Sequence, residues 1–215
     1  MNKIGELLES KYNFKIKKIE NASRSDITKS LNQYVKSLNT NDNFILYYSG
    51  HGEESTDEGF WLPVDADLDD DTNWISNDYV TRKLRQIKAK NILVIADSCY
   101  SGTLTRGIAL DNAELNPDES LINIYKNNKT RVVITSGGEK PVLDGGGNGH
   151  SVFARALLTE LKSLEGTFTA TTLFSSFNER VSKNSTALGL TQIPRFADIP
   201  NSGHENMDFV FSSIN

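Results

Sequence analysis

The chain has 215 residues, a formal net charge of −5 and one cysteine. This length fits a single domain with a substantial core, and the negative charge argues against a surface built for nucleic acid or for anionic membranes. One cysteine excludes an intrachain disulfide, the amino terminus is too charged for a signal peptide, and no segment approaches the ~18 apolar residues of a membrane span. We therefore expect one cytoplasmic domain over residues 1–215, without a nucleic-acid or membrane partner.

The first half of the chain alternates helical and strand-like patterns. Ser76 stands where an N-cap residue would begin a helix, and the run before Cys99 has the β-forming composition of a buried strand. We expect helices near residues 4–8, 25–38 and 76–87, and strands at 14–19, 43–48 and 92–96. Between His51 and Ser76 we expect a polar loop followed by a short apolar piece at residues 60–64.

The second half begins with a polar, asparagine-rich stretch over residues 103–129, which predicts a mobile loop with a short helix near 119–125. A strand at 131–135 then leads through a loop at 136–149 to further helices and strands. We expect helices near 152–161 and 171–183, and short strands near 192–196 and 208–211. The alternation predicts an α/β fold, a mostly parallel sheet with helices on both faces.

Two predicted strands end next to reactive side chains. One leads into the run Ser49-Gly50-His51-Gly52, and the other into the run Asp97-Ser98-Cys99. The carboxyl ends of strands in open α/β sheets are where ligands bind, and small flanking residues let a substrate backbone approach. A thiol and an imidazole in this setting predict a cysteine-histidine hydrolase, with the backbone amides of Gly52 and Cys99 as oxyanion donors.

Each of these residues also has a structural interpretation. A lone cysteine is often buried as a small hydrophobic side chain. His150 precedes a predicted helix and fits a cap or a packed residue, and His204 lies in a turn-like tail segment. We choose His51 as the catalytic partner because only it follows a strand end as Cys99 does.

The two runs together carry a family resemblance. Tyr47-Tyr48-Ser49-Gly50-His51-Gly52 followed by Asp97-Ser98-Cys99-Tyr100-Ser101-Gly102 resembles the paired signature of caspase-like cysteine peptidases. The likeness is closer to metacaspases and bacterial caspase-family proteins than to animal caspases, whose Gln-Ala-Cys pattern is absent. The resemblance implies a caspase-like doubly wound sheet and a cysteine-type endopeptidase with a Cys99–His51 dyad.

The resemblance also implies a substrate class. Asp97 and Ser49 match positions that line the metacaspase pocket for a basic residue, so the expected partner is a protein or peptide cleaved after Arg or Lys. A carboxylate there would pair with a guanidinium or ammonium group. The alternative for Asp97 is a hydrogen bond to backbone at the turn.

One part of the family pattern is missing. The first core strand of the family, and an acidic pocket residue before its first helix, would both lie upstream of Met1. A partner or an upstream segment would then have to supply that strand. Asp144 is a weaker substitute acid and is better explained as a turn residue.

The acidic run at residues 65–71 invites a calcium interpretation, but Asp70 and Ser76 stand where an EF-hand needs glycine and glutamate. Many metacaspases use a different calcium site, and Arg106 occupies one of its acidic positions here. We expect no metal and no other cofactor.

Two other functions fit the same sequence. The missing strand would suit a catalytically silent caspase-like module for interaction or regulation. The dyad would also serve a cysteine hydrolase that acts on non-peptide amides or esters.

Overall fold

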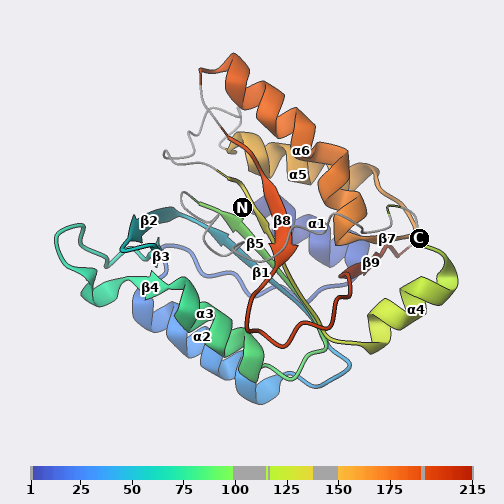
Figure 1. Ribbon diagram of the computed structural model, residues 1–215, viewed down its shortest axis with the longest axis horizontal. Helices are drawn as coiled ribbons and strands as arrows, with labels where there is room; N and C mark the ends of the chain where they lie inside the picture. Colours follow the sequence, from blue (N-terminus) through green and yellow to red (C-terminus); the bar gives the residue numbers. More distant parts are fainter. Residues whose placement is uncertain (1, 99–114, 116, 138–149, 190–191, 215) are drawn as a thin grey trace.

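A four-stranded sheet forms the centre of the computed structural model, which describes residues 2–98, 115, 117–137, 150–189 and 192–214 (Figure 1). The strand order is β1-β5-β6-β8. Strands β1, β5 and β6 are parallel, and β8 pairs with β6 in the antiparallel sense. The bounds are Asn43–Ser49 for β1, Asn91–Asp97 for β5, Thr130–Thr135 for β6 and Arg195–Asp198 for β8. The α/β prediction with a mostly parallel sheet is confirmed.

Helices cover both faces of this sheet (Figure 1). Leu93 and Ile95 of β5 belong to one apolar cluster, and Ile92 and Val94 belong to the other. Alternate residues of a strand point to opposite faces, so a strand covered on both faces is apolar throughout. The first cluster is built on α1 (Asn2–Tyr12), α5 (Val152–Ser163) and α6 (Ala170–Ala187), and the second on α2 (Arg24–Ser37) and α3 (Asn77–Gln86).

Side-chain caps set where several helices begin. Ser23 and Asp26 form a reciprocal capping box at the start of α2, and Ser76 accepts the backbone N–H of Tyr79 at the start of α3. Each cap satisfies an amide that has no partner within the helix. The predicted N-cap at Ser76 is confirmed.

Short strands form two smaller sheets. In the first, β2 (His51–Ser55), β3 (Glu58–Leu62) and β4 (Ile75–Ser76) pair in that order. Thr56 and Asp57 make the β2–β3 turn with φ values of 49° and 66°, the left-handed conformation that tight hairpins require. The polar loop expected after His51 is therefore a hairpin. In the second, β7 (Thr167–Thr169) pairs with β9 (Val210–Ser212).

Two expectations for the loops and tail are partly met. About half of the expected mobile loop falls outside the described residues, but its described end contains α4 (Glu119–Asn127), where the sequence predicts a short helix. The two tail strands exist, with ends displaced by one to three residues from the predicted ranges. No helix in the described ranges is long and apolar enough to cross a membrane.

The predicted strand at residues 14–19 is wrong. This segment is extended but unpaired, and most of its side chains are exposed. Its alternating pattern fits a strand, yet a strand needs a neighbour to satisfy its backbone groups. Among the described residues no strand lies against this segment, so the pattern alone could not make it one.

Candidate active site

Neighbouring parallel strands bring the two predicted runs to the same edge of the sheet. Ser49, the last residue of β1, is in register with Asp97, the last residue of β5. The backbone N–H of Gly50 donates to the carbonyl of Asp97 at 3.4 Å, which ties the two strand ends together. Each predicted catalytic residue lies two positions beyond this pair. Cys99 itself lies outside the described residues, as do Tyr100, Ser101 and Gly102.

His51 lies at the first position of β2, just beyond the central sheet, and its side chain is exposed. The hydroxyl of Tyr48 lies 2.7 Å from the His51 carbonyl oxygen and 3.2 Å from that of Leu62. The Tyr48 ring stacks on Trp61 with centroids 4.3 Å apart and planes 2° from parallel. These contacts fix the backbone on which the imidazole is carried.

Gly50 is the junction between the strand end and His51. A Cβ atom at this position would lie 2.7 Å from the Tyr48 hydroxyl oxygen and 3.0 Å from the ring carbon that carries it. Because Tyr48 is held by Trp61, it has little room to yield. The glycine flanking the imidazole is thus required for close packing.

Asp97 is buried, with 5% of its surface exposed. Its Oδ2 accepts a hydrogen bond from Ser151 Oγ at 2.6 Å and lies 3.5 Å from the Tyr47 hydroxyl. Burial, followed by the charge of Asp97, raises the pKa of Tyr47 well above its usual value. Asp97 therefore carries a contact to Ser151 that the sequence did not predict.

Ser151 links this carboxylate to the first turn of α5. Its Oγ also accepts the backbone N–H of Ala154 at 2.9 Å, which makes Ser151 the N-cap of the helix. The sequence predicts the start of this helix next to His150. Nothing in the local pattern connects Ser151 with Asp97, which lies 54 positions away in the chain. Only the folded sheet brings the two residues together.

The other predicted site residues lie around the same edge. Ser49 is exposed, and Gly52 is buried in β2 opposite Trp61. Ser98 is buried, and its carbonyl accepts a hydrogen bond from Ser136 Oγ at 3.1 Å. The carbonyl preceding Cys99 is therefore anchored to the end of β6. Asp144, the alternative acid, lies outside the described residues.

His150 packs beside the same helix start. It is 9% exposed, and its Nδ1 has no hydrogen-bond partner among the described residues. Burial, with smaller contributions from cationic groups that include Lys3 and Lys162, lowers the pKa of His150. Ser151 is the cap of α5, so the packed-residue alternative fits His150.

His204 lies near the amino ends of the parallel strands, at the opposite end of the sheet from Asp97. Its Nδ1 accepts the backbone N–H of Arg131 at 2.9 Å, and its Nε2 lies 3.0 Å from Asp198 Oδ1. Arg131 is near the amino end of β6, whereas Asp97 is at the carboxyl end of the parallel strand β5. A structural role for His204 follows from this position.

We expect His204 to make the protein sensitive to acid. Burial lowers the pKa of His204, and protonation of Nδ1 would break the bond from Arg131. As the pH falls below the ordinary histidine value of about 6.5, the unfolded chain takes up a proton that the folded chain does not, so the free energy of unfolding decreases. His204→Asn should reduce this slope in urea unfolding measured at several pH values. The remaining slope belongs partly to His150, whose pKa shifts in the same direction; an unchanged slope would contradict the assignment.

No group of three or more histidine, cysteine, aspartate or glutamate side chains in the described part of the chain is arranged to hold a metal ion. In the acidic run, Asp65 accepts the backbone N–H of Arg24, and Asp70 accepts that of Thr72. These carboxylates are therefore engaged in loop and cap contacts.

Comparison with known proteins gives two findings. A family model described as the caspase domain matches residues 1–201. Caspase-1 from Spodoptera frugiperda has a similar structure, with a TM-score of 0.62 and 15% sequence identity over 95% of this chain and 80% of that one. At this identity the likeness shows the fold alone. No curated protein matches the chain.

Proposed function

The chain belongs to the caspase domain family, and from that premise we propose that it is a cysteine-type endopeptidase of the metacaspase type, which cleaves polypeptides after Arg or Lys. The family in general supports a cysteine peptidase. The observation that carries the assignment of this activity to His51 and Cys99 is the register of Ser49 with Asp97. This register sets the two catalytic runs on adjacent strands. The single cysteine supports a cytoplasmic setting.

In the proposed reaction, His51 takes the proton of the Cys99 thiol, and the thiolate attacks the carbonyl carbon of the scissile peptide bond. The negative oxygen that forms is stabilised by the backbone N–H groups of Gly52 and Cys99. The C–N bond then breaks, and the imidazolium of His51 gives its proton to the leaving amine. Water hydrolyses the thioester, which returns the thiol and releases the carboxylate product.

We propose that Asp97 and Ser49 bind the basic side chain of the substrate. Asp97 supplies a buried carboxylate close to the strand end, and a charge-assisted hydrogen bond to a guanidinium group is stronger than one between neutral groups. Ser49 is the exposed residue in register with it. We also propose that a partner or an upstream segment supplies the first strand of the family order.

The test is hydrolysis of matched fluorogenic peptides that end in Arg, Lys or Asp. We expect kcat/KM for the Arg and Lys peptides to exceed that for the Asp peptide by at least about 100-fold, since a charged partner is worth several kcal/mol in a buried pocket. Preference for Asp would contradict the pocket assignment. Absence of any Cys99-dependent labelling by arginyl or aspartyl acyloxymethyl ketones would favour the silent module.

Two variants separate the charge of Asp97 from its contact with α5. Asp97→Asn removes the charge, whereas Ser151→Ala removes the 2.6 Å contact and keeps the charge. We expect Asp97→Asn to raise KM for the Arg peptide at least about tenfold, or ~1.4 kcal/mol, and Ser151→Ala to change it much less. Equal losses in both variants would mean that Asp97 acts by positioning α5.

A further inference from the structure

One residue joins the hairpin that carries His51 to the central sheet. β1 ends at Ser49 and β2 begins at His51, so Gly50 alone forms the connection. Glycine lacks the side chain that restricts the backbone of other residues, and the hydrogen bond from the Gly50 N–H to Asp97 is long, at 3.4 Å. This connection by itself therefore does not fix the direction in which the hairpin leaves β1, nor the position of the imidazole.

Tyr48, the residue before Ser49, braces this connection from the side. Its hydroxyl donates to the carbonyl of His51, three positions along the chain, at 2.7 Å, and its oxygen lies 3.2 Å from the carbonyl oxygen of Leu62. His51 and Leu62 face each other as one pair of the hairpin. One phenol thus contacts both strands of the hairpin beside their junction with β1.

The ring of Tyr48 acts on the next pair of the hairpin. It stacks on Trp61, which is in register with Gly52, the residue whose backbone N–H is the proposed oxyanion donor. Trp61 is 2% exposed and packs in the apolar cluster on α2 and α3, so the ring rests on a close-packed part of the core. Tyr48 therefore supports both groups that the hairpin supplies to the proposed reaction.

The glycine at position 50 belongs to the same arrangement. A Cβ atom there would lie 2.7 Å from the Tyr48 hydroxyl oxygen, so a larger residue would push that oxygen away from its acceptors. Gly50 leaves room for the hydroxyl, and the hydroxyl supplies the restraint that glycine lacks. The two residues therefore work as one joint between β1 and the hairpin.

We propose that Tyr48 is a positioning residue for catalysis, whose hydroxyl holds the hairpin so that the imidazole of His51 stays within reach of the Cys99 thiol. The inference rests on the proposed cysteine-histidine dyad. Tyr48 acts through the backbone of the hairpin and not on the reacting atoms. Ser49 and Asp97, which are proposed to bind the substrate side chain, lie on the central strands. Loss of the hydroxyl should therefore lower kcat and leave KM nearly unchanged.

Tyr48→Phe tests the hydroxyl alone, because phenylalanine keeps the ring that stacks on Trp61. We expect kcat for the Arg or Lys peptide to fall at least about tenfold, with KM changed less than about twofold, since a 1 Å displacement of a reacting group can cost ~100-fold in rate. Rates are compared per folded molecule, with the folded fraction taken from urea unfolding. A loss that disappears after this correction would overturn the proposal.

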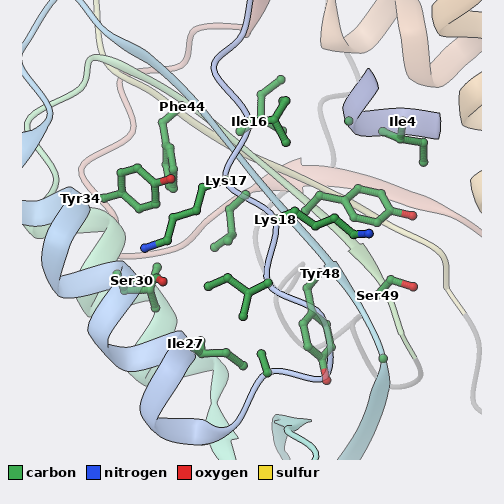
Figure 2. Close-up of a pocket in the computed structure, with 18 of the residues that line it drawn as sticks. Ile4, Ile16, Lys17, Lys18, Ile27, Ser30, Tyr34, Phe44, Tyr48 and Ser49 are labelled. Atoms are coloured by element: carbon green, nitrogen blue, oxygen red, sulfur yellow. The ribbon is translucent and has the colours of Figure 1, made fainter. Parts of the chain in front are cut away.

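Tyr34→Phe is the matched control, because it removes a phenol from the same apolar cluster. Tyr34 lies on α2 and packs against Phe44 near the start of β1, with ring centroids 4.8 Å apart (Figure 2). We expect this variant to keep the wild-type kcat and KM. Equal losses of kcat in Tyr34→Phe and Tyr48→Phe would overturn the positioning role.

Alkylation of Cys99 separates the positioning role from the dyad itself. Cys99 is the single cysteine of the chain, and a protonated imidazole beside a thiol keeps it reactive as the thiolate at lower pH. Labelling by iodoacetamide at pH 6, followed by mass spectrometry, measures this pairing without substrate. We expect His51→Ala and Tyr48→Phe both to slow it, the first more strongly. Unchanged labelling in His51→Ala would contradict the dyad and the inference together, whereas unchanged labelling in Tyr48→Phe alone would overturn only the positioning role.

Gly50→Ala reaches the same hydroxyl by a second route. The added Cβ should displace the hydroxyl and slow both hydrolysis and labelling, as Tyr48→Phe does. In the double variant the oxygen at 2.7 Å is gone, and the nearest ring carbon lies at 3.0 Å. The double variant should therefore lose no more activity than Tyr48→Phe alone. Losses that multiply in the double variant would show that Gly50 and Tyr48 act independently, which would overturn the proposal.

Discussion

Replacement of Cys99 by alanine is expected to remove the hydrolysis of Arg and Lys peptides, with a fall in kcat/KM of at least about 10³-fold. The reason is chemical: alanine offers no nucleophile, and water at the same position is a far weaker one than a thiolate. His51→Ala should cost a similar amount, because the thiol loses its base and the leaving amine loses its proton donor. The two losses should not add in the double variant, since the dyad acts as a unit.

Histidine variants provide the controls for this experiment. His204 lies at the opposite end of the sheet from Asp97, so His204→Asn should keep most of the activity near neutral pH. His150 lies beside Ser151, which contacts Asp97, and is the histidine that would compete with His51 for the assignment. Activity that survives His51→Ala but is lost in a folded His150→Ala variant would transfer the catalytic role to His150.

Gly137→Ala is expected to destabilise the fold by about 3 kcal/mol or more, or to prevent folding. Gly137 has φ +61°, and a Cβ atom on it would lie 1.6 Å from the carbonyl oxygen of Ile193. The obstacle is backbone rather than a flexible side chain. It is also locked in place, because the N–H of Ile193 donates to the Gly137 carbonyl at 2.7 Å. Urea unfolding, or soluble yield if the protein does not fold, measures the effect.

Gly166→Ala is the matched control for this substitution. Gly166 has φ +71°, so the backbone strain is similar, but nothing lies within 4 Å of an added Cβ atom. This variant should cost only about 1–2 kcal/mol, the usual penalty of the left-handed conformation. A similar loss in both variants would show that backbone conformation, rather than the contact with Ile193, dominates at Gly137.

The central strands and most helices could be predicted because their signals are local. The apolar run of β5 and the cap at Ser76 determine structure within one element. The segment at residues 14–19 has an equally clear local pattern, but pairing is a property of two strands. Among the described residues no strand pairs with this segment, so the pattern predicted an element that does not form.

The candidate site also contains some features that local sequence predicts and others that it does not. The position of His51 and Cys99 after strand ends follows from two short runs in the sequence, and the register of Ser49 with Asp97 agrees with it. The hairpin that carries His51 was missed, because its turn uses Thr56 and Asp57 rather than a glycine pair. The contact between Asp97 and Ser151 was missed because it joins residues far apart in the chain.

The stacked pair of Tyr48 and Trp61 gives this molecule an optical reporter. Trp61 is one of two tryptophans, is 2% exposed, and stacks on the ring whose hydroxyl contacts the His51 carbonyl. A displacement of the hairpin that carries His51 would therefore change the surroundings of a buried indole. Trp74, the other tryptophan, is replaced by phenylalanine so that the emission comes from Trp61 alone. The fluorescence of Trp61 then reports movement of the hairpin that carries His51 when substrate binds, without any added label.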